Sequence, residues 1–109
     1  MLLSKAPSAP PSDVQLHMAN DSALNLHWND VPLIHQDGVI LGYRLRLQQE
    51  DGGQVVWNVT VGPDVHGYIF SDLLIFQNYS IQMLAFTIKG DGPLREKVYQ
   101  MTDESGELN

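Results

Sequence analysis

The feature that most constrains the fold of this chain is a two-residue alternation of apolar and polar side chains in short segments. In one segment Leu24, Leu26 and Trp28 alternate with Asn25 and His27. Successive side chains of a strand point to opposite faces, so a period of two predicts strands with one buried face. The segments that read as strands are 14–18, 24–28, 43–48, 55–61, 68–70, 79–85 and 97–102. No segment reads as a helix.

Turn residues separate these segments. Asn20-Asp21-Ser22, Glu50-Asp51-Gly52-Gly53 and Gly62-Pro63-Asp64 each combine residue types that favour turns, and a longer loop covers 29–38. Seven short strands at this regular spacing predict an all-β fold. The expected architecture is a seven-stranded Greek-key β-sandwich of the immunoglobulin-like type.

Composition excludes several classes of function. The chain has 109 residues, which suits one domain with its own hydrophobic core. It contains no cysteine, so disulfides, thiolate metal ligands and thiol nucleophiles are ruled out. Its net charge of −7 argues against nucleic acid as a partner, because that binding needs a basic surface. No apolar run approaches the roughly 20 residues of a membrane-spanning helix.

The two ends differ in composition from the middle of the chain. The stretch APSAPPS, residues 6–12, is typical of an extended linker, and residues 103–109 are polar. We therefore expect a linker over 1–11, one domain over 12–104 and a second linker over 105–109. This organisation is that of a module within a longer chain.

Five short motifs occur in the order found in a known family, and the chain resembles the fibronectin type III domain. They lie at 8–14, 22–28, 38–47, 90–93 and 102–104, so the resemblance covers nearly the whole chain. It implies structural roles for Trp28, buried at the end of the second strand, and for Tyr43 in the third. The lack of cysteine fits this family better than antibody-type sandwiches, which use a buried disulfide.

A sixth motif is the most specific. Leu73 stands six residues before Tyr79, as in the tyrosine corner of the family. A buried tyrosine needs a hydrogen-bond partner for its hydroxyl, and the resemblance implies that backbone groups supply it. The chain departs from the family at Ile75, usually a proline, and at Gln100, usually apolar. At Ile75 we expect a looser corner. At Gln100 we expect an irregular register or a bulge in the last strand.

The resemblance implies a non-enzymatic module that spaces domains or binds proteins in a cell-surface receptor or adhesion protein. The implied partners are neighbouring domains and a cell-surface or matrix ligand, on the extracellular side of the plasma membrane in a membrane-anchored parent chain. No cofactor, nucleic acid or small-molecule substrate is expected. Two alternatives stay open, a module of an intracellular scaffold or muscle-type protein and an accessory module of a secreted enzyme. The residues themselves show no catalytic motif and no metal-ligand spacing.

Three Asn-x-Ser/Thr sequons begin at Asn20, Asn58 and Asn78, which is more than this composition predicts by chance. Asn20 and Asn78 fall at predicted turns, and Asn58 has the polar parity of its strand. A glycan at any of them would leave the core undisturbed. The excess favours the secretory route, and the alternative is coincidence with some sequons unused.

A candidate partner-binding surface comprises Arg44, Arg46, Leu84 and Phe86, which have the outward parity of strands that are neighbours in the family. Apolar side chains beside arginine are favoured at protein interfaces. The alternative is that a neighbouring domain, or Trp57 of the adjacent strand, covers this face.

The tripeptide Lys89-Gly90-Asp91 differs by one residue type from the Arg-Gly-Asp motif that integrins bind. In the resemblance, Gly90 and Gly92 are turn glycines, needed for backbone angles that other residues resist. This structural interpretation is favoured over an integrin-like attachment loop.

Overall fold

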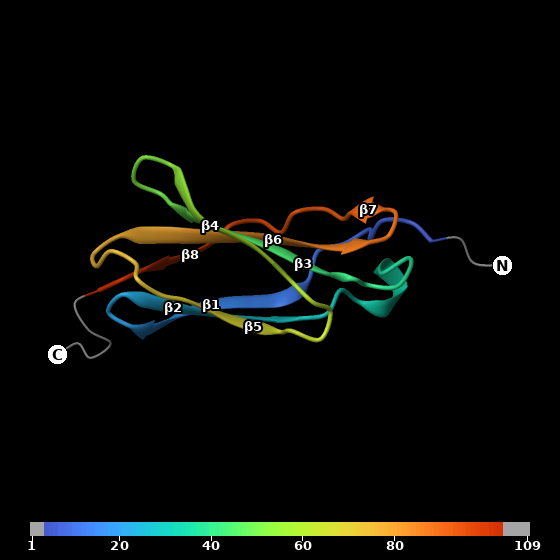
Figure 1. The fold of residues 1–109 in the computed structure, drawn as a ribbon, viewed down its shortest axis with the longest axis horizontal. Helices are drawn as coiled ribbons and strands as arrows, with labels where there is room; N and C mark the ends of the chain where they lie inside the picture. Colours follow the sequence, from blue (N-terminus) through green and yellow to red (C-terminus); the bar gives the residue numbers. More distant parts are fainter. Residues whose placement is uncertain (1–3, 104–109) are drawn as a thin grey trace.

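Two antiparallel β-sheets pack face to face in the computed structural model, which describes residues 4–103 (Figure 1). The smaller sheet has the order β1-β2-β5, and the larger has the order β4-β3-β6, with β7 and β8 both paired with β6. The strands are β1 Ser12–Asn20, β2 Ala23–Asn29, β3 Gly42–Gln49, β4 Gln54–Val61, β5 Gly67–Phe70, β6 Asn78–Thr87, β7 Gly90–Asp91 and β8 Val98–Met101. The predicted all-β sandwich is confirmed.

Two short elements were not predicted. A 3-10 helix, η1 Leu33–His35, lies in the long loop for which no helix was expected. Strand β7 consists of Gly90 and Asp91 and pairs with Phe86 and Thr87, where the sequence suggested only a turn. The chain turns back so tightly after β6 that its pairing resumes within three residues.

The two glycines of this turn are required for different reasons. Gly90 has φ +136, an angle that side chains resist, as expected. The expectation that Gly92 also serves the backbone angle is wrong, because no positive φ occurs there. A Cβ at Gly92 would lie 2.8 Å from Cβ of Pro7 and 3.2 Å from the carbonyl oxygen of Ala85, so this position is glycine for lack of space.

The core lies between the sheets and is built from the inward parity of each strand, as the alternation predicted. Trp28 and Tyr43 are both buried, and their rings meet edge to face with centroids 5.5 Å apart. Trp57 also points inward, with its ring 6.1 Å from that of Phe70. The buried apolar residues of the core are Val14, Leu16, Leu24, Leu26, Trp28, Val31, Tyr43, Leu45, Leu47, Phe70, Leu73, Tyr79, Ile81, Met83 and Ala85.

The proline-rich segment before β1 is fastened to the sandwich. Pro7 and Pro11 are buried. The Lys5 amide donates to the Asp37 carbonyl at 2.8 Å, and the hydroxyl of Thr87 donates to the Lys5 carbonyl at 2.7 Å. These contacts hold the segment where the sequence suggested a linker. The second predicted linker, 105–109, lies outside the described residues.

The tyrosine corner ties three parts of the fold together. Tyr79 is buried, and its hydroxyl accepts a hydrogen bond of 3.0 Å from the Leu74 amide. The amide of Leu73 donates to the Ser22 carbonyl, which links the corner to the β1–β2 turn. Thr102, beyond β8, donates its hydroxyl to the Leu74 carbonyl at 2.7 Å. The buried phenol thus has the backbone partner that the sequence predicted.

The last strand is regular. β8 pairs with β6 without a shift of register, and Gln100 lies opposite Tyr79. The side chain of Gln100 is half-buried, and its Nε2 donates to the Met101 carbonyl at 2.9 Å. The bulge considered from the sequence is therefore absent from β8.

We predict that Tyr79→Phe lowers the free energy of unfolding by about 1–3 kcal/mol, because it leaves the Leu74 amide without its acceptor. Urea denaturation followed by fluorescence measures the change. Tyr99→Phe is the matched control, since Tyr99 is 54% exposed and its hydroxyl bonds to no described residue. Equal stability of the two variants would contradict the role of the corner.

Candidate functional site

The outward face of the larger sheet places three polar side chains in one row. Arg46 of β3 lies opposite Asn58 of β4 on one side and opposite Gln82 of β6 on the other. In the next row Arg44 lies between Thr60 and Leu84. Directly opposite residues have Cβ atoms about 5 Å apart, so each row brings its side chains into reach of one another.

Arg44 is held in place by its neighbours. Its guanidinium lies over the ring of Phe86, 4.2 Å from the centroid. Its Nε donates to Oδ1 of Asp91 at 3.0 Å, and its Nη1 donates to the hydroxyl of Thr60 at 3.3 Å. The cation–π contact and the ion pair leave Arg44 few donors for a partner.

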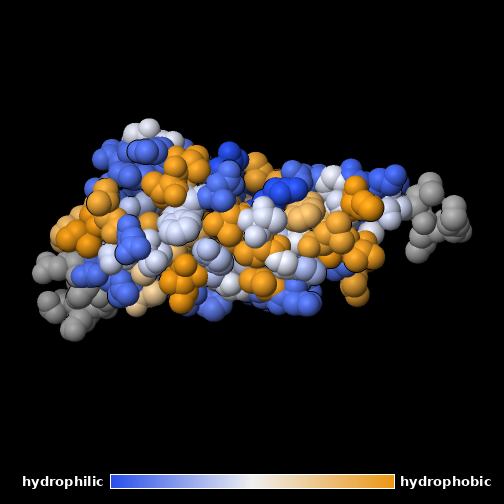
Figure 2. All heavy atoms as spheres, viewed as in Figure 1, coloured by the Kyte–Doolittle hydropathy of each residue, from blue (hydrophilic) through white to orange (hydrophobic). Residues whose placement is uncertain are grey.

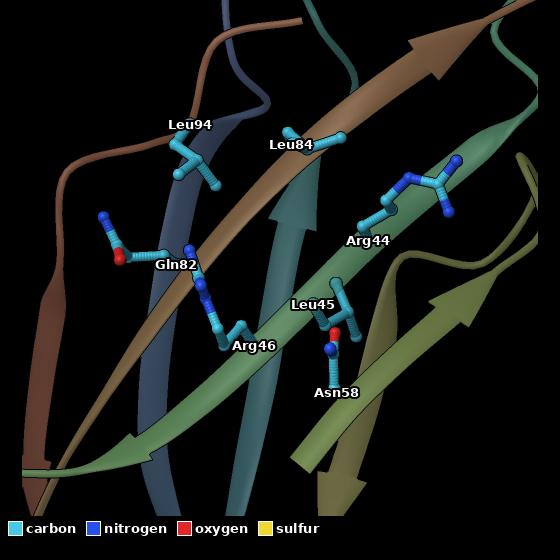
Figure 3. Close-up of a pocket in the computed structure, with 7 residues that line it drawn as sticks. All are labelled: Arg44, Leu45, Arg46, Asn58, Gln82, Leu84 and Leu94. Atoms are coloured by element: carbon cyan, nitrogen blue, oxygen red, sulfur yellow. The ribbon is translucent and has the colours of Figure 1, made fainter. Parts of the chain in front are cut away.

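Arg46 has no such partners. Its side chain forms no hydrogen bond and no ion pair among residues 4–103, and the residue is half-buried. It lies in a depression of about 160 Å³ that we call the Arg46 hollow. The side chain of Arg46 extends toward Gln82, and Asn58 lies at the opposite rim (Figure 3). The hollow is lined by Arg44, Leu45, Arg46, Asn58, Gln82, Leu84 and Leu94.

Three of the four residues predicted for this surface line the hollow, namely Arg44, Arg46 and Leu84. Phe86 is not among the lining residues and contacts Arg44. Trp57 does not cover this face, because it points into the core. On the face of the molecule shown in Figure 2, apolar side chains form separate patches between polar ones. The assignment of these residues to partner binding stays a prediction.

Sequence reasoning did not assign Leu45, Gln82 or Leu94 to this face. Gln82 could have been found, because it has the same outward parity on its strand as Leu84. Leu94 lies between β7 and β8 and is 45% exposed. No periodic pattern places a residue of such a connection, so Leu94 reaches the site only through the path of the folded chain.

The Lys89-Gly90-Asp91 tripeptide is part of the β6–β7 hairpin. Asp91 accepts the hydrogen bond from Arg44, with both side chains about half exposed. Integrin-type recognition of this motif needs a free aspartate carboxylate, and here that carboxylate is engaged within the domain. The geometry favours the structural interpretation of the tripeptide.

The three sequon asparagines differ in their surroundings. Asn20 and Asn58 are exposed, and Asn78 is half-buried. Oδ1 of Asn20 accepts a hydrogen bond of 2.9 Å from the Ser22 amide, which leaves its Nδ2 unbonded. Occupancy by glycan stays a prediction for each position.

A polar cluster at one end of the sandwich was not anticipated. The hydroxyl of Tyr43 donates to Oδ1 of Asp30 at 2.7 Å, and Nε2 of His66 lies 2.5 Å from the same oxygen. The hydrogen bonds from His66 and, second, from Tyr43 lower the pKa of Asp30 below its ordinary value of 3.8. Burial, and then the bond to Asp30, raise the pKa of Tyr43.

A second unexpected cluster joins Glu50 to β6 and to the segment before β8. Its Oε2 accepts hydrogen bonds from the hydroxyl of Ser80 at 2.6 Å and from Nζ of Lys97 at 3.2 Å. The Ser80 bond, followed by the Lys97 bond, lowers the pKa of Glu50. Ser80 has the same outward parity on β6 as Gln82 and Leu84, so this cluster lies beyond Gln82 on the outward face, with Lys97 engaged by Glu50.

Residues 4–103 contain neither a cluster of metal ligands nor a membrane-spanning helix. No group of three or more histidine, aspartate and glutamate side chains is arranged to hold a metal ion there. Within the same residues, no helix has the length and apolar character needed to cross a membrane.

The two sheets, the tyrosine corner and an open outward face define an immunoglobulin-like β-sandwich module. The model of the family described as "Fibronectin type III domain" matches residues 9–101. The chain belongs to the fibronectin type III family.

Known relatives and a solved structure agree with this assignment. Protein sidekick-1 of Mus musculus is 37% identical over 95 residues, and the netrin receptor DCC of Homo sapiens is 35% identical over 92 residues. Each match covers 84% of this chain but only 4% and 6%, respectively, of the relative. The third fibronectin III domain of human KIAA0343 protein has a TM-score of 0.79 at 21% identity, covering 95% of this chain and 89% of that domain, and shows the same fold.

We predict that the stability lost in Asp30→Asn depends on pH. A carboxyl group whose pKa is lower in the folded state stabilises the fold above its unfolded pKa, and this contribution disappears as pH falls through the folded pKa. The difference in free energy of unfolding between wild type and Asp30→Asn should therefore shrink between about pH 5 and about pH 2. Urea denaturation at a series of pH values measures it.

The matched control for this titration is Asp21→Asn, at an exposed aspartate whose carboxylate bonds to no described residue. It removes a carboxylate charge without removing a hydrogen bond to a described residue, so it measures the effect of the charge alone. A constant difference for Asp30→Asn would contradict the stabilising role of the His66 and Tyr43 hydrogen bonds.

Proposed function

We propose that this chain is a non-enzymatic module in the extracellular part of a cell-surface receptor or adhesion protein, where it spaces neighbouring domains and binds another protein. The observation that carries the proposal is its match to sidekick-1 and to a protein named as a netrin receptor. Because the chain corresponds to a few per cent of their lengths, it has the size of one module in a long protein.

The sequons support the extracellular part of this proposal. Asn20 and Asn58 have exposed side chains, and Asn78 begins a strand at the end of the sandwich. Oligosaccharyl transfer at Asn20 and Asn58 is compatible with the folded domain without any rearrangement of the core. In a module of an intracellular scaffold, the three sequons would be coincidental and unused.

The Arg46 hollow supports the binding part. Arg46 offers donors that no described residue satisfies, beside the apolar side chains of Leu84 and Leu94. A partner that places a carboxylate or carbonyl oxygen against Arg46 and an apolar side chain against the leucines would match this chemistry. Because the domain has a net charge of −7 and repels a broadly acidic surface, the chemistry fits a single carboxylate or carbonyl placed against Arg46.

The alternatives make different predictions. An intracellular scaffold or muscle-type protein would carry no glycan at the three sequons. An accessory module of a secreted enzyme would carry glycans but would be joined to a catalytic domain in its parent chain. Cell attachment through Lys89-Gly90-Asp91 would require release of Asp91 from Arg44.

We predict that peptides of the natural parent protein carry glycan at one or more of Asn20, Asn58 and Asn78. Treatment with N-glycosidase converts a glycosylated asparagine to aspartate, and mass spectrometry detects the conversion. Recovery of all three peptides unmodified would contradict the extracellular assignment and move the domain to the intracellular class.

For the binding role, we predict that Arg46→Glu lowers binding of a multivalent form of this chain to cells by about tenfold or more, as expected for an arginine at an interface. The chain is produced in bacteria, without glycan, and binding is measured by flow cytometry. Lys89→Glu makes the same change of charge outside the hollow and should leave binding nearly unchanged. Equal effects of the two variants would show that the hollow is not the interface.

A further inference from the structure

Asn58 is both a sequon asparagine and a lining residue of the Arg46 hollow. It is exposed and lies directly opposite Arg46 in the strand register. Asn20 and Asn78 are not among the lining residues. From this juxtaposition we propose that N-linked carbohydrate on Asn58 lies in the Arg46 hollow and covers the side chain of Arg46.

The chemistry of the hollow suits a neutral sugar. A guanidinium has five N–H donors and no acceptor, and those of Arg46 are unpaired among the described residues. The nearby carboxylates are already engaged, Asp91 by Arg44 and Glu50 by Ser80 and Lys97. No acceptor among the described residues is bonded to the Arg46 guanidinium. Sugar hydroxyls and the acetamide carbonyls of the core N-acetylglucosamines are acceptors that could reach it from Asn58.

The hollow also has an apolar side and a polar far rim. Leu84 and Leu94 offer surface to the C–H face of a pyranose ring, and Gln82 offers an amide at the rim opposite Asn58 (Figure 3). The first sugar would lie over the aliphatic stem of Arg46, which extends away from Asn58 toward Gln82. The second sugar then reaches the guanidinium.

Covalent attachment makes weak contacts sufficient. A group tethered at the rim of its own binding site has an effective concentration in the millimolar range. A glycan on Asn58 therefore occupies the hollow more readily than a free oligosaccharide would. In this arrangement the glycan and a protein partner compete for Arg46, so glycosylation of Asn58 controls access to the candidate binding face. This inference rests on the proposed extracellular function, because N-glycans are added in the secretory route.

The test is a thermodynamic cycle on the full chain with Asn20→Gln and Asn78→Gln, so that Asn58 is the remaining sequon. The chain is secreted by mammalian cells that leave uniform oligomannose glycans, and the same sequence is produced without glycan in bacteria. Arg46→Ala is introduced into both forms. We expect Arg46→Ala to lower the Tm by about 4 °C more in the glycosylated than in the bare chain, the effect of losing one or two hydrogen bonds.

A matched control moves the glycan. In a chain that keeps only the Asn20 sequon, with Asn58→Gln and Asn78→Gln, Arg46→Ala should lower the Tm equally with and without glycan. A second readout is the rate at which phenylglyoxal modifies Arg46, measured by mass spectrometry. It should be slower in the Asn58 glycoform than in the Asn20 glycoform.

The outcomes separate this inference from the proposed function. Equal effects of Arg46→Ala in all four chains, with equal modification of Arg46, would overturn the inference. A secreted chain that carries glycan at Asn20 or Asn78 but never at Asn58 would also overturn it, and the extracellular assignment would stand. Absence of glycan from all three positions of the natural protein would overturn both.

Discussion

Strand β3 is hydrogen-bonded along both edges, to β4 on one side and to β6 on the other, and the rest of the structure depends on its alternation. Its odd-numbered residues Tyr43, Leu45 and Leu47 are fully buried. Burial of an aliphatic side chain of this size contributes about 1.5–3 kcal/mol, so the register of β3 is strongly fixed. The same register places Arg44 and Arg46 on the outer face. One face of β3 thus contributes to the core, and the opposite face contributes to the candidate site.

The two arginines show how neighbouring positions acquire different roles. They are two residues apart on the same face, yet Arg44 is held by Phe86, Asp91 and Thr60 while Arg46 is unpaired. The difference comes from the neighbouring strands, because β7 brings Asp91 to Arg44, whereas no described residue forms an ion pair with Arg46. Arg44 therefore stabilises the β6–β7 edge, and Arg46 is available for a ligand.

The ends of the sandwich are closed by hydrogen bonds to backbone groups. At one end Tyr79 and Thr102 satisfy amides and carbonyls of the connection between β5 and β6, where Ile75 replaces the usual proline. The structure holds this corner through side-chain hydroxyls and does not need a rigid ring at that position. At the other end Lys5 and Thr87 hold the first segment against the loops.

The alternation in the sequence by itself determined seven of the strands, the sandwich and the outward parity of Arg44, Arg46, Leu84 and Phe86, because a two-residue period records which face of a strand is buried. The tyrosine corner was implied by the resemblance to the family. Only the tertiary structure decided that Asp91 pairs with Arg44, that Leu94 reaches the hollow and that Asp30 meets His66 and Tyr43. The role of Gly92 was also decided by the tertiary structure, because Pro7 packs against it and leaves no room for a side chain. These contacts join residues far apart in the chain, and their distances follow from how the sheets and loops pack. A local pattern of hydrophobicity contains no information about such distances.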